Sequence, residues 1–318
     1  MKQEALFDLV PDTPSALKEK NGVQHFELSC KSILNYCDTY RMPDTFTINP
    51  YRGCEFGCSY CYARYTHEFM DLEWDEFEKK IFVKGRAADV LLRTLDHKRV
   101  AGRHIAMGTA TDPYQPAEAK FHLTRKILNV FAQTEGLSLS ITTKSSLVKR
   151  DIDLFQKIAE KNDFQVNISL TSLDGNLLAK LEPKASRPQA RLTALREITA
   201  AGVRAGIFIM PILPGITDSR ENLESVVRAA RLKGAHYVSF NVLFLRESAK
   251  TIFYGFLRQN HPNLYRKYHE IYGARSYAPG RYRDKISTLV NTLKKKYGFG
   301  EGSRSQTKTR VPQQPLLS

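Results

Sequence analysis

Short runs of apolar and β-branched residues alternate along the chain with segments in which apolar residues recur every three or four positions. Several runs are too continuously apolar for half-exposed strands, so they indicate parallel strands covered on both faces. The expected strands cover residues 45–48, 104–109, 137–143, 164–171, 203–211 and 237–244, with a possible extra strand at 80–84. Helical spacing over 123–131, 152–159, 192–199 and 223–230 predicts amphipathic helices between them, and Gly202 and Gly234 predict where the last two end.

The order of these elements, strand then helix, predicts an α/β fold built from repeated βαβ units. Six units with right-handed crossovers favour a partial (β/α)6 TIM-type barrel. The strand pattern alone leaves a doubly wound open sheet as the alternative. We expect residues 1–44 to form an N-terminal extension, 45–245 the barrel, 246–299 a basic helical region and 300–318 a flexible tail.

The composition is that of a soluble globular protein, because 42% of the 318 residues are hydrophobic and 25% are charged. The formal net charge is +15, of which +11 falls after Leu245, in a region that includes Lys294, Lys295 and Lys296. This charge favours an anionic partner, nucleic acid first, although a basic surface that only aids solubility explains it equally well. Neither a membrane-spanning apolar stretch nor a signal peptide is found, so we expect a cytoplasmic protein with no membrane partner.

The five cysteines lie in the first fifth of the chain, and three of them fall within eight residues. Cys54, Cys58 and Cys61 belong to the segment NPYRGCEFGCSYCYAR, which follows the first expected barrel strand. Such clustering in a cytosolic chain indicates a metal centre rather than a disulfide framework. Cys30 and Cys37 have no standard ligand spacing, and we interpret them as buried small hydrophobic residues.

Two kinds of metal centre are compatible with three clustered cysteines. A structural zinc site needs four ligands, and His67 is the nearest candidate for the fourth. An iron–sulfur cluster normally takes four cysteines, so three would leave one iron open for chemistry. Three buried thiols without a metal are the remaining possibility.

The spacing Cys-x3-Cys-x-aromatic-Cys, with Tyr60 as the aromatic residue, resembles the radical S-adenosylmethionine (SAM) superfamily. The sequence of residues 40–245 more widely resembles the spore photoproduct lyase-like subgroup of this superfamily. The segments that carry this resemblance are GTATDPYQPAE, TTKSSLVKRD, NISLTSLD and IMPILPGITD. The resemblance implies a 4Fe–4S cluster on Cys54, Cys58 and Cys61, with SAM chelating the fourth iron. It also implies reductive cleavage of SAM to a 5′-deoxyadenosyl radical that abstracts hydrogen from a substrate, with an electron donor such as flavodoxin or ferredoxin.

The resemblance further implies that SAM lies across the carboxyl ends of the strands. Thr109 and Thr111 then stand where the family meets the SAM amino group, and Lys144 is placed to pair with the SAM carboxylate. A solvated loop lysine is the alternative for Lys144. The other expected cofactor residues are Tyr60, Ser169 and Thr171. The β-propensity of Ser169 and Thr171 explains their positions equally well.

Met210 and Pro211 are expected to form an apolar surface against which adenine packs. For Met210, packing in the core is the alternative.

One departure from the subgroup concerns the hydrogen atom that spore photoproduct lyase returns to its product from a cysteine at the end of the second strand. This chain has no cysteine after Cys61, so the lesion-repair reaction is not carried over and the substrate stays unassigned. Tyr62, Tyr65 and Tyr114 are candidates for the hydrogen donor. A zinc-stabilised nucleic-acid-binding protein without catalysis and an electron carrier are the rival hypotheses; a carrier normally needs four cysteines per cluster and a shorter chain.

Overall fold

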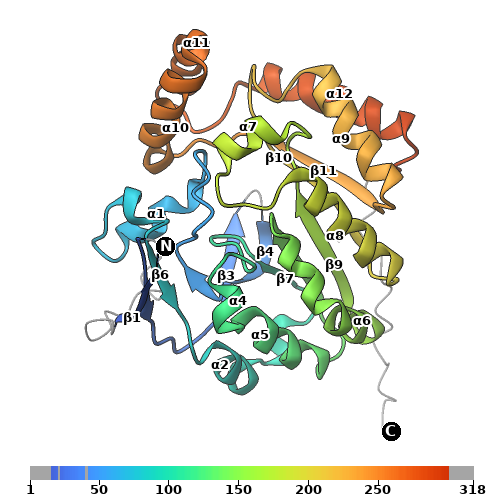
Figure 1. The fold of residues 1–318 in the computed structure, drawn as a ribbon. Helices are drawn as coiled ribbons and strands as arrows, with labels where there is room; N and C mark the ends of the chain where they lie inside the picture. The colour runs from blue at the N-terminus through green and yellow to red at the C-terminus, as the bar shows by residue number, and fades with distance from the viewer. Residues whose placement is uncertain (1–15, 21, 40–41, 301–318) are drawn as a thin grey trace, which may run out of the picture.

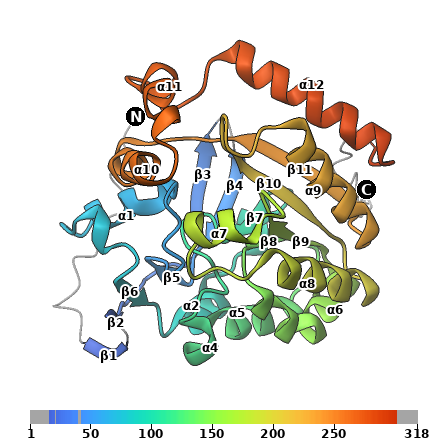
Figure 2. The same ribbon diagram turned by 45° about the horizontal axis from the view of Figure 1, so that its top comes forward.

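The computed structural model describes residues 16–20, 22–39 and 42–300, and a seven-stranded sheet in the order β11-β10-β9-β8-β7-β4-β3 lies at its centre (Figure 1). Each of its six parallel strands lies beside the next one in the chain, whereas a doubly wound sheet reverses its order at a switch point. The sheet curls into a half-barrel (Figure 2), so the predicted partial TIM-type barrel is confirmed and the doubly wound alternative is wrong. The parallel strands are β4 (Met42–Ile48), β7 (His104–Met107), β8 (Ser138–Thr143), β9 (Asp163–Ser169), β10 (Ala205–Ile212) and β11 (Tyr237–Val242).

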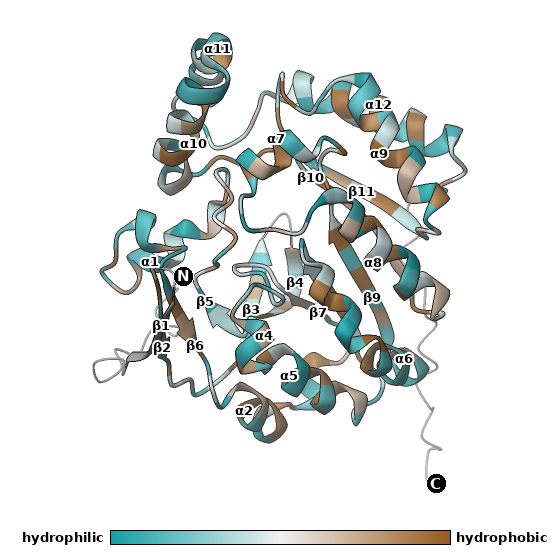
Figure 3. Cartoon of the chain, in the orientation of Figure 1, coloured by the Kyte–Doolittle hydropathy of each residue, from teal (hydrophilic) through white to brown (hydrophobic). Residues whose placement is uncertain are grey.

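Helices cover the convex face of the half-barrel, with their apolar sides turned toward the strands (Figure 3). Gly202 and Gly234 follow α8 and α9 with φ values of 81° and 80°, as expected of residues that end helices. The main covering helices are α2 (Ala87–Thr94), α5 (Leu123–Ala132), α6 (Ile152–Lys161), α8 (Pro188–Ala200) and α9 (Arg220–Leu232). Shorter helices in the connections are α3 (His97–Val100), α4 (Glu118–Phe121) and α7 (Gly175–Leu181).

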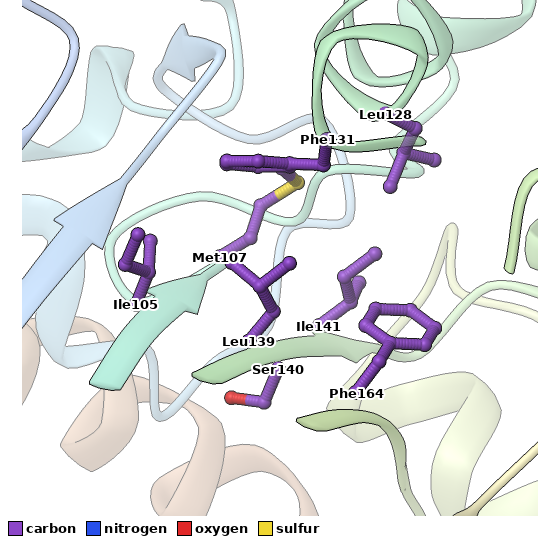
Figure 4. A pocket seen from close by; sticks show the side chains of 8 residues that line it. All are labelled: Ile105, Met107, Leu128, Phe131, Leu139, Ser140, Ile141 and Phe164. Atoms are coloured by element: carbon purple, nitrogen blue, oxygen red, sulfur yellow. The ribbon is translucent and has the colours of Figure 1, made fainter. Parts of the chain in front are cut away.

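The layer between sheet and helices is a close-packed apolar core. Behind β7 and β8, Met107 and Leu139 meet Leu128 and Phe131 of α5 around a void of about 10 Å³ (Figure 4). A void of this size has room for about one water at most, so it is ordinary core packing and not a ligand site.

The opposite, concave face of the sheet carries polar side chains. Ser140 points away from α5 (Figure 4), and Asn167 donates to Thr142 Oγ1 at 3.1 Å and accepts from the Tyr237 hydroxyl at 2.6 Å. Gly206 makes this last contact possible, because a Cβ there would lie 2.5 Å from the Tyr237 ring. The inner wall of the half-barrel is therefore lined by hydrogen-bonding groups.

A second sheet, in the order β1-β2-β6-β5, lies beside the half-barrel. Its strands are β1 (Ala16–Lys20), β2 (Val23–Glu27), β6 (Lys80–Val83) and β5 (Tyr51–Arg52), and α1 (Tyr65–Glu68) lies in the connection between β5 and β6. The extra strand expected at 80–84 thus exists, but it pairs with β2 and β5 and not with the barrel.

The segment expected as a mere extension contributes to the barrel sheet. β3 (Asn35–Thr39) pairs antiparallel with β4 and forms one edge of the seven-stranded sheet. It is polar and largely exposed, so no apolar run marked it as a strand. The prediction that Cys30 and Cys37 are buried was wrong: both are partly exposed, because Cys37 lies on this edge strand and Cys30 in the segment before it.

The chain beyond the barrel is helical, as predicted. It forms α10 (Glu247–Asn260), α11 (Pro262–Tyr272) and α12 (Gly280–Lys296), and α12 packs along α9 and β11 (Figure 2). Within the described residues, no helix combines the length and the apolar character needed to cross a membrane. The tail expected at 300–318 lies, from residue 301 on, outside the described residues.

Candidate active site at the carboxyl edge of the half-barrel

The cysteine loop leaves β5 and passes along the carboxyl edge of the sheet. Its shape depends on Gly53, which has a φ of 83° and whose Cβ would lie 2.6 Å from the Lys80 carbonyl oxygen. The Cys54 amide donates to the Phe77 carbonyl at 3.0 Å and the Cys61 amide to the Cys58 carbonyl at 3.2 Å. The backbone therefore fixes the loop whether or not the thiols bind anything.

The three thiols of the loop share one electrostatic environment. Cys54 and Cys58 are buried, Cys61 is partly buried, and negative charge on one raises the pKa of another. Burial is the main cause that raises all three pKa values, that of Cys58 to about 12. Bare thiolates are therefore disfavoured here, and a metal centre, which deprotonates its cysteine ligands, would supply positive charge that favours them.

His67 does not join the cysteines. Its Nε2 lies 3.0 Å from the Lys80 carbonyl oxygen, and its ring packs edge-on against Phe77 and Phe82. The zinc alternative thereby loses its expected fourth ligand. Among the residues that the structure describes, no group of three or more His, Cys, Asp or Glu side chains is arranged to hold a single metal ion.

Thr111 supports the cysteine loop through a hydrogen bond to its backbone. Its hydroxyl donates to the Gly53 carbonyl at 2.6 Å and accepts from Gln115 Nε2 at 2.9 Å. Gln115, fully buried, also donates to the Gly53 carbonyl at 3.1 Å and accepts from the Glu55 amide at 2.9 Å. A contact of Thr111 with the cofactor stays a prediction, while its observed hydrogen bonds support the backbone of the cysteine loop.

Thr109 follows β7 and lies at the edge next to Asn49. The Asn49 amide donates to Thr109 Oγ1 at 3.2 Å, and Asn49 Oδ1 accepts from the Ala110 amide at 2.8 Å. Between them and the strand stands Gly108, whose φ is 92° and whose Cβ would lie 2.6 Å from the Thr142 carbonyl oxygen. Only glycine allows the chain to turn this closely over β8.

Lys144 follows the last residue of β8 and brings a cation to the cysteine loop. Its amide donates to Asp112 Oδ2 at 2.8 Å, and the ammonium lies 5.8 Å from the centre of the Tyr60 ring. Burial acts to lower the pKa of Lys144, but negative charge on Cys58, Glu182 and Asp112 outweighs it and raises this pKa. Lys144 Nζ makes no hydrogen bond or ion pair with any other described residue.

The remaining expected residues lie further along the same edge. Ser169, the last residue of β9, is buried. The Thr171 hydroxyl donates to the Pro211 carbonyl at 2.5 Å and so connects the chain after β9 to β10. Met210 is partly buried within β10, joined to Pro211 by a cis peptide bond. The structure therefore brings Tyr60 and Lys144 to the cysteines and leaves Thr171 in a separate contact.

All three tyrosines considered as hydrogen donors have contacts within the described structure. Tyr114 is buried with its hydroxyl 3.0 Å from Asp151, and the Tyr65 ring is covered by the Arg246 guanidinium at 4.1 Å. Tyr62, directly after Cys61, is 39% exposed, and its hydroxyl donates to the Thr109 carbonyl.

Sequence reasoning missed three residues of this site, namely Gln115, Glu182 and Arg191. All three are buried polar side chains that act on the cysteine loop from distant positions in the chain. Only Gln115 lay within a quoted motif, and no spacing distinguishes a buried Glu–Arg pair nine residues apart from surface charges.

A comparison with protein families shows to which superfamily the chain belongs. Residues 48–227 match the model of the Radical SAM superfamily. The chain belongs to the radical SAM superfamily. It is 36% identical over 279 residues to the uncharacterized protein Rv2578c of Mycobacterium tuberculosis, covering 87% of this chain and 82% of the relative. It is 33% identical over 253 residues to the uncharacterized protein MJ0683 of Methanocaldococcus jannaschii, covering 79% and 86%.

Solved structures of spore photoproduct lyase share the fold. One, with bound AdoMet and dinucleoside spore photoproduct, superposes with a TM-score of 0.65 at 15% identity over 83% of this chain and 76% of the lyase. At this identity the match bears out the resemblance for the fold alone. The superfamily implies a 4Fe–4S cluster and SAM for this chain.

The residues at this edge fit those cofactors. Three thiols with raised pKa values, two of them buried and one partly buried, form a sulfur donor set, and the ammonium of Lys144 lies near them, where it could pair with an anionic group. Gly108 keeps the neighbouring edge free of a side chain.

Proposed function

We propose that the chain holds a 4Fe–4S cluster on Cys54, Cys58 and Cys61 and cleaves SAM reductively at it. The observation that carries this proposal is the group of three thiols, two buried and one partly buried, beside the ammonium of Lys144 at the carboxyl edge of the strands. When bound, the cluster and SAM supply a 5′-deoxyadenosyl radical that removes a hydrogen atom from the substrate.

In this chemistry the protein positions the thiols and SAM and shields the reacting groups from water. Gly53, Thr111 and Gln115 hold the loop that presents the thiols, and Lys144 pairs with the carboxylate of SAM. The surrounding half-barrel keeps water away from the reacting groups. A one-electron donor such as flavodoxin or ferredoxin completes the reaction.

The first test of this function is the content of the purified protein. After anaerobic reconstitution, the protein should contain one 4Fe–4S cluster per chain and change its electron paramagnetic resonance (EPR) signal when SAM is added to the reduced form. A colourless protein that binds zinc in its place would contradict the proposal.

We also propose a nucleic-acid substrate, supported by aromatic side chains at the carboxyl edge. The ring centre of Phe244 lies 6.0 Å from that of Tyr62 and 4.7 Å from that of Tyr277. Tyr62 is 39% exposed and Tyr277 is 41% exposed. Aromatic rings together with cations are the usual means by which proteins bind unpaired bases. Arg246, two residues after Phe244, is a cation of this region, and its guanidinium lies 4.1 Å from the centre of the Tyr65 ring.

The nucleic-acid proposal is tested with a fluorescent single-stranded oligonucleotide in an anisotropy titration. Tyr277→Ala should weaken binding about 5- to 150-fold, as expected for the loss of one stacked base. Tyr36→Ala is the matched control, because Tyr36 is also an exposed tyrosine, at 47%, but lies on β3, where its hydroxyl donates to Asp44. Equal affinity in both variants, or no binding by the parent, would point to another substrate.

A further inference from the structure

A buried ion pair stands directly behind the cysteine loop. The Glu182 carboxylate pairs with the Arg191 guanidinium, and the two residues are 2% and 1% exposed. The same carboxylate accepts a hydrogen bond from the Tyr60 hydroxyl. A carboxylate removed from water is tolerated only when its oxygens are paired in this way.

The segment that carries Glu182 is attached to the loop on both sides. The Ser59 amide donates to the Leu181 carbonyl at 2.9 Å, and the Lys184 amide donates to the Phe56 carbonyl at 3.2 Å. Any shift of Glu182 therefore moves the stretch of the loop between Phe56 and Ser59, which includes Cys58.

Arg191 connects the ion pair to the end of β9. Its Nη1 donates to the Ser169 carbonyl at 2.9 Å and its Nε to the Ser186 carbonyl at 2.7 Å. The guanidinium is thus fixed by backbone groups at the strand end, and Glu182 is held between this fixed cation and the Tyr60 hydroxyl.

Lys144 lies on the other side of Tyr60. Its ammonium is 5.8 Å from the centre of the ring whose hydroxyl Glu182 holds, and it forms no hydrogen bond or ion pair within the described part of the chain. Negative charge on Glu182 and on Asp112 raises the pKa of Lys144, whereas positive charge on Arg191 lowers it. Without the Glu182 carboxylate, repulsion between the ammonium and the buried guanidinium would be offset less, in a site of low dielectric constant.

We propose that Glu182 is a positioning residue of the SAM site: held by Arg191, it fixes the Tyr60 ring and balances the charge of Lys144, so that this ammonium stays directed toward the carboxylate of SAM. This proposal rests on the proposed function, in which Lys144 pairs with SAM. A buried Glu–Arg pair that only stabilised the fold would have no such effect on ligand binding.

The chain provides a matched control for this proposal in Glu118. This carboxylate is also fully buried, and it accepts from the Tyr51 hydroxyl at 2.5 Å and from Arg150 Nη2 at 2.6 Å. It has the same kinds of partner as Glu182, but negative charge on it is not among the causes that shift the pKa of Lys144.

The experiment compares Glu182→Gln with Glu118→Gln in the reconstituted protein. We expect Glu182→Gln to keep its iron and its cluster spectrum but to bind SAM at least tenfold more weakly in equilibrium dialysis, with a smaller SAM-induced EPR change. Glu118→Gln should bind SAM within twofold of the parent. Glu182→Asp, which keeps the charge, should recover part of the affinity.

Tyr60→Phe covers the case in which Glu182→Gln does not fold, because it leaves the ion pair intact and removes only the hydroxyl. We expect it to weaken SAM binding about threefold with unchanged iron content. Unchanged SAM affinity in every folded variant, or an equal loss in Glu118→Gln, would overturn the proposal. Failure of the parent to bind SAM would instead refute the proposed function.

Discussion

At the scale of single residues, the three thiols are the part of the site that the sequence predicts best. Cys58→Ala should abolish or strongly reduce iron binding, because a cluster ligand inside a fixed loop has no substitute within reach. Cys30→Ala and Cys37→Ala should retain full iron content, since both residues lie outside the loop. Iron and sulfide analysis after anaerobic reconstitution is the measurement, and full iron in the Cys58→Ala protein would falsify the assignment.

Lys144 is the residue on which SAM affinity should depend most directly. Replacing it with Ala should weaken SAM binding by about 1–3 kcal/mol, the range for losing a charge-assisted hydrogen bond. Lys149→Ala is the control, because this lysine is already paired with Glu197 at 3.2 Å. Isothermal titration of the reconstituted proteins measures the difference, and an unchanged dissociation constant in Lys144→Ala would remove this residue from the site.

The pattern of residues explains why part of the site could be foreseen. Cys54 and Cys58 can be recognised from the spacing of the cysteines, and Lys144 from its position directly after an expected strand. Gln115 and Glu182 cannot be recognised in this way, because each acts through a contact with a segment about 60 or 120 residues away in the chain. Such contacts depend on the packing of loops, which no local pattern encodes.

At the scale of elements, α1 is held against β6 by a histidine that burial keeps uncharged. Burial lowers the pKa of His67 to about 4, and its hydrogen bond to Lys80 only partly offsets this. The unfolded chain takes up the proton below a pKa of about 6.5, the folded protein only near 4, so the contribution of His67 is complete above pH 6.5 and is lost as the pH falls toward 4. At pH 5 the loss amounts to about 2 kcal/mol.

Denaturant unfolding of the metal-free protein at pH 7 and pH 5 tests this dependence. His67→Gln should unfold more easily at pH 7 but lose less stability on acidification than the parent. His97→Gln, a change at an exposed position, should behave like the parent at both pH values. An equal pH dependence in all three proteins would show that His67 does not titrate as described.

The last turn of α12 carries the basic cluster that the sequence singled out. Lys296 is paired with Glu224 at 2.5 Å, whereas Lys295 is exposed and Lys294 partly so. If nucleic acid binds here, Lys294→Gln with Lys295→Gln should weaken binding and lower the slope of log affinity against log salt by up to about 1.4–1.8, while Lys296→Gln should change it less. Anisotropy titrations at several salt concentrations decide this, and equal slopes would place the contact elsewhere.

The strands of the half-barrel were predicted more accurately than the elements beside it. The convex sides of the six parallel strands are apolar because helices cover them from outside, and this burial makes the strands visible in the sequence. β3 escaped notice because an exposed edge strand has no such pattern, and the pairing of β6 with β2 depends on contacts between distant segments.

At the scale of the whole molecule, the carboxyl ends of the strands collect every group that the proposed chemistry needs. The cysteine loop follows the first barrel strand, Lys144 the third, and the aromatic series begins beside Cys61 and continues at Phe244 after the last strand. In a half-barrel these positions meet at one edge although they are spread over nearly 200 residues. The placement of the site is therefore a consequence of the fold, while its substrate depends on the residues at the rim.

The central claim is that this edge holds SAM at a cluster bound by three cysteines and cleaves it reductively. The most direct measurement is the amount of 5′-deoxyadenosine formed when the anaerobically reconstituted protein is incubated with SAM and dithionite and the products are separated by liquid chromatography. We expect 5′-deoxyadenosine from the parent protein and none from a variant in which Cys54, Cys58 and Cys61 are all replaced by Ala. Absence of 5′-deoxyadenosine from a fully loaded, reduced parent, or equal amounts from the triple variant, would contradict the claim.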